Sequence, residues 1–231
     1  MNFSWDRLAD GVFRTRLPFL DVAVGVVAGR SGCLLIDTGS TLAEGRAINT
    51  DVAELTMQPV CHVLLTHDHF DHVLGFPAFG GAQVYCAPPV AGTVTSGREY
   101  LRADAIRHGA DTEEVDAAIG ALREPDCKLW EATVDLGGRT VVISHPGRGH
   151  TDHDLIAVVA AADVTVVFCG DLVEESGDPS IEFDSDLDAW PATLDRVLAA
   201  GGGDAVYVPG HGSAVDADFV RRQRRWLTAR K

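Results

Sequence analysis

Three histidines and two aspartates occur within seven residues of this sequence, in the segment Thr66-His67-Asp68-His69-Phe70-Asp71-His72. Imidazole nitrogens and carboxylate oxygens are ligands of zinc and related metals. In an extended chain, side chains two positions apart point to the same side. We therefore expect His67 and His69 to bind one ion, while Asp71 and His72 face a neighbouring position. The apolar run 60–65 precedes the motif and predicts a buried strand that ends at a metal site.

Three further β-rich runs lead into residues that could bind a metal. The run 141–143 precedes a loop with His150, the run 164–169 ends before Asp171, and the run 205–209 ends before His211. Taken singly these residues are unremarkable, because a lone histidine is more often structural and a Gly-Asp pair is usually a turn. Their repeated position after β-rich runs predicts that four loops meet at one edge of a sheet.

The elements that must position these loops alternate between strand and helix patterns. The β-rich runs 21–28 and 33–36 predict a hairpin, and helical spacing predicts helices at residues 41–55, 98–108, 112–122, 188–199 and 216–231. Residues 1–231 are expected to form one domain, with a helical insertion at about residues 96–123.

The insertion is the segment in which we expect substrate choice to lie. Gly109 separates its two helices, and their apolar side chains are Tyr100, Leu101, Ala105, Val115 and Ile119. These side chains are predicted to face a substrate pocket as a wall or lid. The alternative is that they only pack on the domain.

Composition limits the classes of partner. The net charge of −15 argues against a nucleic-acid partner, because nucleic-acid binding needs a basic surface. No apolar run approaches the length of about 20 residues that a membrane-spanning helix needs, and the N-terminus lacks the pattern of a secretory signal, so a cytoplasmic location is expected. The five cysteines have no CxxC spacing and are predicted to be small buried side chains in a reducing compartment.

In their order along the chain, the His-x-His-x-Asp-His motif, Gly149-His150-Thr151, Gly170-Asp171-Leu172 and Pro209-Gly210-His211-Gly212 resemble the motifs of the metallo-β-lactamase-fold superfamily. The resemblance implies an α/β (α+β) fold, a four-layer αββα sandwich of two mixed β-sheets flanked by helices. It also implies two metal ions held by seven ligands: His67, His69 and His150 on the first, Asp71, His72 and His211 on the second, and Asp171 between them.

Two positions bear on the metal and the branch of the family. Relatives that reduce oxygen or nitric oxide tend to have Glu where this chain has His69, so two Zn²⁺ ions are expected, with iron or manganese as alternatives. Relatives that hydrolyse antibiotics often have Cys in place of Asp171, so this chain is more similar to the thioesterase and lactonase branches.

The implied reaction is hydrolysis by a hydroxide held between two zinc ions. The predicted substrate is a small-molecule ester, lactone, thioester or amide, with a β-lactam included. Asp71 is the predicted catalytic residue, because besides binding one ion it can orient the hydroxide or pass a proton to the leaving group. The alternatives are a phosphodiesterase or an oxidoreductase on the same fold, and a metal-binding protein without catalysis.

Several other residues carry weaker expectations. Asp37, which ends a strand, is expected either near the metals or in a simple turn. His153 is predicted to be an exposed loop residue, with a place near the site as the alternative, and the loop with Arg148 could contact substrate. No motif supports a functional role for His62, His108 or His145, so these are predicted to be structural.

Overall fold

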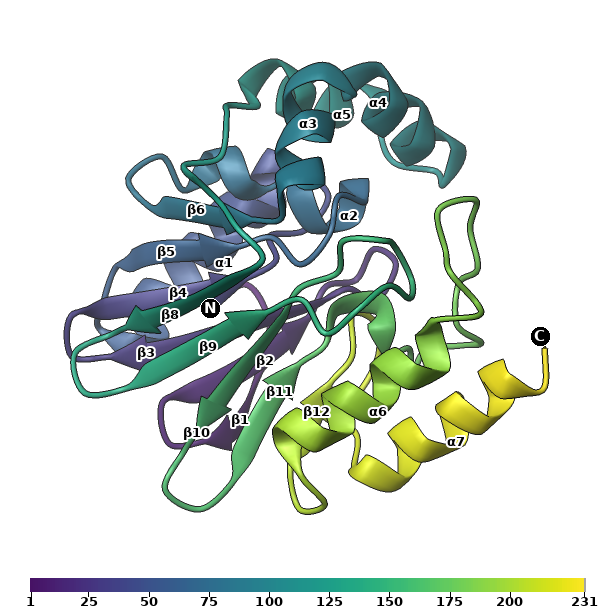
Figure 1. The fold of residues 1–231 in the computed structure, drawn as a ribbon. Helices are drawn as coiled ribbons and strands as arrows, with labels where there is room; N and C mark the ends of the chain where they lie inside the picture. The colour runs from purple at the N-terminus through teal and green to yellow at the C-terminus, as the bar shows by residue number, and fades with distance from the viewer. Residues whose placement is uncertain (231) are drawn as a thin grey trace.

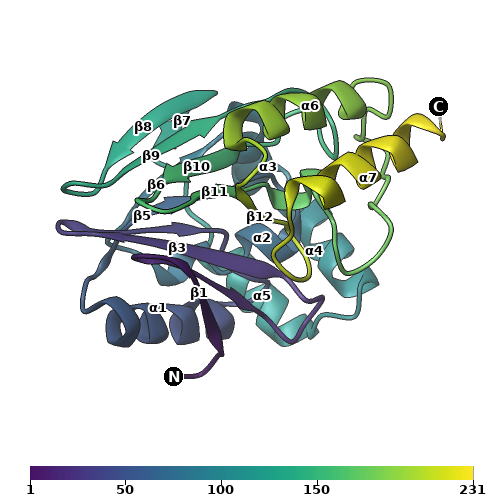
Figure 2. The ribbon, with the colours of Figure 1, turned by 90° about the horizontal axis from the view of Figure 1, so that it is seen from below.

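The computed structural model describes residues 1–230, which form two β-sheets that pack face to face, with helices on both outer faces (Figure 1). Figure 2 shows the four layers from below: helix α1 (Leu42–Thr56) covers the first sheet, and helices α6 (Trp190–Gly201) and α7 (Ala217–Thr228) cover the second. This is the αββα sandwich that the sequence predicts.

Within the described residues, the first sheet has seven strands in chain order: β1 (Trp5–Ala9), β2 (Val12–Arg16), β3 (Ala23–Gly29), β4 (Gly32–Ile36), β5 (Val60–Leu64), β6 (Gln83–Cys86) and β7 (Cys127–Lys128). Strands β1 to β4 are antiparallel, and β4 to β7 are parallel. The predicted hairpin is β3–β4, which closes with Gly29 opposite Gly32.

The second sheet runs in the order β12-β11-β10-β9-β8 over the part of the chain that the structure describes. Its strands are β8 (Glu131–Asp135), β9 (Thr140–Ser144), β10 (Ile156–Ala160), β11 (Thr165–Phe168) and β12 (Val206–Val208). Strands β11 and β12 are parallel, so their carboxyl ends reach the same edge of the sheet. The loops after β11 and β12 therefore emerge side by side.

The remaining helices lie near the edge where these strands end (Figure 1). They are α2 (Phe70–Val73), η1 (Phe76–Ala78), α3 (Pro88–Ser96), α4 (Arg98–Arg107), α5 (Thr112–Ala121) and η2 (Gly170–Leu172). Gly109 has a φ of 91° and separates α4 from α5, as predicted. Helix α3 is not predicted by the sequence analysis, and the helical segment therefore begins at Pro88. No helix among residues 1–230 is long and apolar enough to cross a membrane.

The core between the sheets depends on a close contact between one backbone and one ring. A Cβ on Gly25 of β3 would lie 2.2 Å from Cε1 of Phe168 on β11. Glycine therefore lets the aromatic ring fill the space between the sheets. A second apolar cluster joins the outer face of the second sheet to α6 and α7 through Trp190, Tyr207 and Val220, each fully buried.

The cysteines are only partly as predicted. Cys33, Cys86 and Cys169 are buried, whereas Cys61 and Cys127 are half-buried, and all five are free thiols. Cys61 and Cys127 differ from the prediction because they lie at the beginnings of strands, where the chain reaches the surface.

Candidate metal centre

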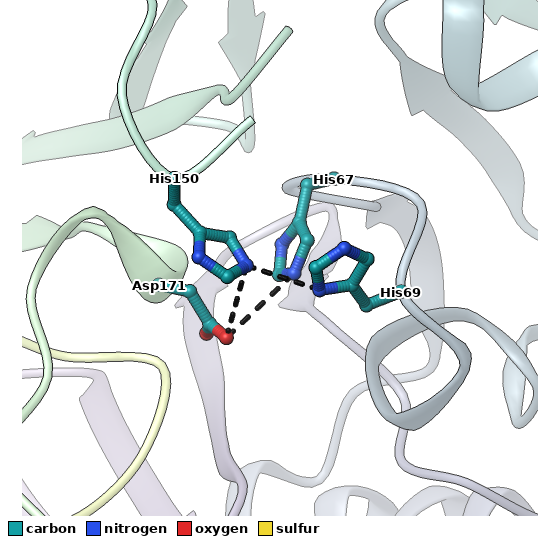
Figure 3. Close-up of side chains that lie close together, drawn as sticks. All are labelled: His67, His69, His150 and Asp171. Carbon is teal, nitrogen blue, oxygen red and sulfur yellow. Dashed lines mark hydrogen bonds and ion pairs between the residues drawn. The ribbon is translucent and has the colours of Figure 1, made fainter. Parts of the chain in front are cut away.

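Three loops bring His67, His69, His150 and Asp171 together at the edge of the sandwich (Figure 3). Their candidate ligand atoms all lie within 4.8 Å of one another, and all four residues are buried. Nε2 of His150 lies 3.0 Å from Nδ1 of His69 and 3.5 Å from Oδ2 of Asp171. Nε2 of His67 lies 3.8 Å from the same oxygen. The group has the size and the donor types of a single metal site.

A second group of three, Asp71, His72 and His211, lies beside the first, again with candidate ligand atoms within 4.8 Å of one another. Asp171 adjoins both groups, because its Oδ1 is 3.2 Å from Nε2 of His72 and its Oδ2 is 3.2 Å from Nε2 of His211. The structure thus gathers all seven residues that the resemblance implies as ligands. They form two groups with one shared carboxylate.

The local backbone differs from the extended segment that the sequence analysis assumes. Strand β5 ends at Leu64 and the chain stays irregular only to His69, where the short helix α2 begins. Asp71 and His72 therefore project from a helical turn. On the facing loop, a Cβ on Gly210 would lie 1.7 Å from Oδ1 of Asp171, so glycine there allows the backbone after β12 to approach this carboxylate.

Four imidazoles are oriented by an oxygen on the far side of each ring. His72 donates from Nδ1 to the Asp37 carboxylate at 2.9 Å. His150 donates from Nδ1 to the backbone carbonyl of Ser180 at 3.2 Å, and His211 donates to that of Leu20 at 2.7 Å. The fourth, His67, donates to Oγ1 of Thr66 at 3.0 Å. A ring that donates from Nδ1 keeps its Nε2 lone pair for the centre, which is the arrangement that metal-binding histidines need.

Asp37 makes several of the hydrogen bonds that surround the candidate ligands. It is therefore a group near the site and not only a turn residue. Its carboxylate accepts hydrogen bonds from the Thr66 backbone N and side-chain Oγ1, both at 2.9 Å, as well as from His72. Its φ of 60° lies in the left-handed region that L side chains rarely adopt. Strain of this kind persists where the surrounding contacts fix the residue in place.

His153 contradicts its prediction as an exposed loop residue. Its exposed fraction is 4%, and its Nε2 lies 3.0 Å from Oδ1 of Asp68. Asp68 also accepts a hydrogen bond of 2.6 Å from Oγ1 of Thr93 on α3. Burial favours a lower pKa for His153, but its contacts with Asp68 and Asp152 outweigh burial and raise the pKa to about 9. His153 therefore ties its loop to the segment between His67 and His69.

The electrostatics of the centre favour neutral imidazole at two of its rings. Burial lowers the pKa of His150 to about 4, against the attraction of Asp171. Burial also lowers the pKa of His67 well below its ordinary value. Both rings are therefore in the form that binds metals at neutral pH. Nε2 of His67 and Nε2 of His69 are buried and have no hydrogen-bond partner within the described chain.

Without a bound metal ion, the rings of His211 and His69 are protonated and carry positive charge. Burial opposes the charge on His211, but Asp171 and Asp71 outweigh it and raise the pKa to about 10. Burial likewise opposes charge on His69, and the contact with Asp184 raises its pKa to about 9. The positive charge of these protonated rings stabilises the negative charge of the buried carboxylates beside them. A divalent metal ion meets the same need, so the residues fit a metal centre.

A cavity of about 230 Å³ opens over this centre, lined by His69, Asp71, His150, Asp171 and His211 among others. Helix α4 contributes Asp104, and His108 follows it at the helix end. His108 is predicted to be structural, but it lines the cavity and its ring stacks on Phe70, with the two centroids 5.6 Å apart. Sequence periodicity could not identify this role, because His108 reaches the cavity only through the placement of α4.

The predicted inward face of the helical insertion does not line this cavity. Leu101, Ala105 and Val115 have exposed fractions of 0% and pack in the main core, and Ile119 packs against the same core. The expected wall of apolar residues is therefore wrong for these four side chains. Tyr100 is half-buried, and its ring contacts Phe183 edge to face, with centroids 6.0 Å apart.

Three other predicted residues lie outside the cavity. His62 packs against Tyr85, and His145 donates from Nδ1 to the backbone oxygen of Asp154 at 2.8 Å, so both are structural as predicted. Arg148 pairs with Asp186 at 3.3 Å. Two acidic residues without a sequence motif do approach the centre: Glu174 lies with Asp171 and His211, and Asp184 lies 3.6 Å from Nε2 of His69.

Comparisons with known proteins agree with this architecture. The family model of the metallo-beta-lactamase superfamily matches residues 17–211. A curated relative, the metallo-beta-lactamase type 2 of Bacteroides fragilis, is 25% identical over 138 residues, which are 58% of this chain and 55% of that protein. The chain thus matches about half of the length of this relative.

Solved structures match over nearly the whole chain. A metallo-beta-lactamase from Pontibacter korlensis has a TM-score of 0.74 at 22% identity, with 98% of this chain and 99% of that chain covered. The FIM-1 metallo-beta-lactamase from Pseudomonas aeruginosa, in its mono-zinc form, has a TM-score of 0.72 at 19% identity, with coverages of 99% and 96%. These likenesses establish the fold. Because the family model matches the chain from β3 to β12 and includes all the candidate ligands, the chain belongs to the metallo-beta-lactamase superfamily.

Proposed function

We propose that this protein is a dinuclear zinc hydrolase that cleaves an ester, lactone, thioester or amide bond in a small molecule. The observation that carries the proposal is the position of Asp171, whose carboxylate lies within 3.2 Å of Nε2 of both His72 and His211 and within 3.5 Å of Nε2 of His150. One carboxylate between two groups of imidazoles is suited to two neighbouring ions.

The residues divide into two sets of ligands under this proposal. His67, His69 and His150 would hold one ion, Asp71, His72 and His211 the other, and Asp171 both. Zinc bound there would supply Lewis acidity toward a carbonyl oxygen and would bring the pKa of water close to neutral. Imidazole-rich sets favour zinc among the common metals, and the mono-zinc form of a solved relative supports that choice.

Asp71 is the residue to which we assign a catalytic role. Its Oδ2 lies 3.5 Å from Nε2 of His211, and its side chain lines the cavity. From this position the carboxylate can orient a water molecule or hydroxide in the cavity and can transfer a proton to a leaving group. No serine or cysteine is needed as a nucleophile, because water is the nucleophile in this proposal.

The test begins with metal content. Protein purified without chelator and with zinc supplied is expected to contain close to two zinc ions per chain by elemental analysis, following the two ligand groups. Less than half an equivalent would contradict the proposal. Two equivalents of iron, with little zinc, would favour the oxidoreductase alternative instead.

A panel assay then separates the reaction classes. Zinc-loaded protein is compared on a lactam, a lactone, an acyl thioester, a carboxylic ester and a phosphodiester, with chelator-treated and re-zincated protein as controls. Metal-dependent cleavage of a carbonyl substrate supports the proposal. Cleavage confined to the phosphodiester would replace it with the phosphodiesterase alternative.

A further inference from the structure

Acidic side chains surround the cavity beyond the candidate metal ligands. Asp104, Glu174, Asp178 and Glu182 all line it, in addition to Asp71 and Asp171 at the centre. Among the described residues that line the cavity there is no lysine or arginine. Asp104 is paired with Arg107, so the wall carboxylates for which the described residues show no ion pair are Glu174, Asp178 and Glu182.

Three arginines of neighbouring segments have acidic partners already, whereas Arg222 lies in a separate pocket that Glu174 and Asp178 also line. Arg107 pairs with the Asp104 carboxylate, and Arg16 forms a bidentate ion pair with Asp21. Arg148 pairs with Asp186 at 3.3 Å. None of the three lines the cavity. A guanidinium held by a carboxylate contributes little attraction to a second anion, because the pair is close to neutral overall.

Asp178 and Glu182 line the cavity from one loop segment. Both belong to the segment 173–189, between η2 and α6, which rises beside α4 in Figure 1. The contact between Phe183 and Tyr100 joins this segment to α4. Asp178 is exposed and Glu182 is half-buried. Carboxylates at the surface of a cavity contribute to the electrostatic potential that an approaching solute meets.

We infer that this site selects against substrates with an anionic group remote from the scissile carbonyl, and favours uncharged and especially cationic substrates. The inference rests on the proposed function and names its substrate class. The negative wall acts on the part of the substrate that lies away from the metals, whereas the reacting carbonyl faces the metal centre. A carboxylate remote from the bond would meet Asp178 and Glu182, and none of the described residues that line the cavity is a lysine or arginine that could pair with it.

The size of the effect follows from Coulomb's law. Two unit charges about 8 Å apart in a water-like medium interact by a few tenths of a kcal/mol, or about twofold in affinity, and lower local dielectric increases this. Each of two such carboxylates attracts a cation and repels an anion, so together they should change the ratio of the two affinities by about 16-fold without screening and by about fivefold at a Debye length of about 10 Å. The effect should shrink in 1 M salt, where the Debye length is about 3 Å.

Binding provides a readout that does not need turnover. Protein loaded with Co²⁺ is titrated with thiocholine, 2-mercaptoethanol and 2-mercaptoethanesulfonate, which present a thiol on a short ethyl arm ending in a cation, a neutral group and an anion. The absorbance of Co²⁺ reports occupancy. Because the thiol pKa differs among the probes, the deciding quantity is how the ratio of Kd values for the anion and the cation changes between protein variants.

The variants are matched in net charge. Asp178→Asn with Glu182→Gln removes two charges at the cavity. The control, Asp163→Asn with Asp204→Asn, removes two charges at exposed turns that precede β11 and β12. These turns lie at the ends of the two strands that point away from the metal centre. The first pair is expected to lower the ratio of Kd values about fivefold at low salt, and the second pair less than twofold. Equal ratios in all three proteins would overturn the inference.

A kinetic series completes the test. Aryl esters with one leaving group and acyl chains of equal length, ending in trimethylammonium, methyl or carboxylate, are expected to show falling kcat/KM in that order. Co²⁺ binding without any charge ranking would refute the selectivity and leave the metal centre standing. If the protein binds neither Co²⁺ nor Zn²⁺, the proposed function is wrong, and the inferred substrate class is wrong as well.

Discussion

The Asp37 carboxylate lies 2.9 Å from Nδ1 of His72 and accepts two more hydrogen bonds from Thr66, although the backbone of Asp37 has a φ of 60°. One strained residue thus orients His72 directly and His67 through Thr66, since Nδ1 of His67 is 3.0 Å from Oγ1 of Thr66. The two rings lie in different ligand groups. The orientation of both candidate sites therefore depends on a residue that belongs to neither group of candidate ligands.

Asp37→Asn should weaken metal binding without removing any ligand. The carboxylate of Asp37 accepts hydrogen bonds with both oxygens, whereas an asparagine has an NH₂ group in place of one of them. That NH₂ group would face another hydrogen-bond donor, so either Thr66 or His72 would lose its acceptor. Loss of such an outer contact typically costs about 10- to 100-fold in metal affinity. Competition with a coloured chelator measures the effect. Unchanged zinc affinity in a folded variant would show that Asp37 does not orient the rings.

Asp171→Ala should have a larger effect, because this carboxylate adjoins both groups. We expect zinc content to fall from about two ions per chain to one or fewer, and kcat/KM to fall by more than about 100-fold, beyond the loss typical of outer contacts. Elemental analysis and the best substrate of the panel measure these two quantities. Full metal content with normal turnover would disprove the bridging role.

Much of the site could be predicted from sequence because its parts are local. His67, His69, Asp71 and His72 are near neighbours, and His150, Asp171 and His211 each follow a β-rich run. Strand ends are positions where a parallel sheet gathers side chains. Pattern and position therefore locate the candidates, and the resemblance to the superfamily implies the set of seven that the structure brings together.

The remainder depends on contacts that no local pattern contains. His153 pairs with Asp68, which lies on a distant segment and is itself held by Thr93 of α3. The helical periodicity of α4 identifies an apolar face, but not whether that face meets the core or a cavity; Leu101 and Ala105 turn out to pack in the core. His108 and Glu182 line the cavity from loops whose placement depends on the whole fold.

Asp51 gives a prediction about pH. This buried carboxylate on α1 accepts hydrogen bonds from the backbone N of Asn2 at 2.6 Å, the backbone N of Phe3 at 2.8 Å and Nε1 of Trp5 at 3.1 Å. Burial favours a raised pKa for Asp51, but these donors outweigh it and lower the pKa. A carboxyl group with a lowered folded-state pKa adds stability above its unfolded pKa of about 3.9, and that stability is lost as the pH falls through the folded value.

Asp51→Asn should therefore destabilise the protein by about 2 kcal/mol at pH 7, the scale of hydrogen bonds to a charged acceptor. The difference from the unmodified chain should stay constant down to about pH 5 and shrink below pH 4. Urea unfolding of both metal-free proteins across this range measures it. A difference that grows on acidification would contradict the assignment of charge to Asp51.

Two glycines should respond in opposite directions to the same change. A Cβ at Gly25 would lie 2.2 Å from the Phe168 ring, so Gly25→Ala should cost about 1–3 kcal/mol through overpacking between the sheets. A Cβ at Gly120, in helix α5, meets nothing within 4 Å. Gly120→Ala should therefore stabilise by about 0.5–1 kcal/mol through helix propensity. Urea unfolding decides both, and destabilisation by Gly120→Ala would contradict the open space around α5.

The contact between Phe183 and Tyr100 yields a prediction about substrate choice. Phe183 is 81% exposed, and its ring meets Tyr100 on α4. An aromatic ring this exposed, next to the cavity-lining Glu182, offers apolar surface to a bulky substrate. Phe183→Ala should therefore lower kcat/KM about three- to tenfold for a substrate with a long apolar acyl chain, and by less than twofold for an acetyl analogue.

A double-mutant cycle and a packing control decide whether the pair acts as a unit. If the two rings support one another, adding Tyr100→Ala to Phe183→Ala should cost less in kcat/KM than Tyr100→Ala costs alone. Ile119→Ala, which truncates a side chain packed on the core, should lower the melting temperature and leave the ratio of the two efficiencies unchanged. Additive effects of the two ring deletions would show that the contact across the cavity has no part in selection. An unchanged ratio in Phe183→Ala itself would place the apolar contact elsewhere in the cavity, at Leu20 or Phe70, which also line it.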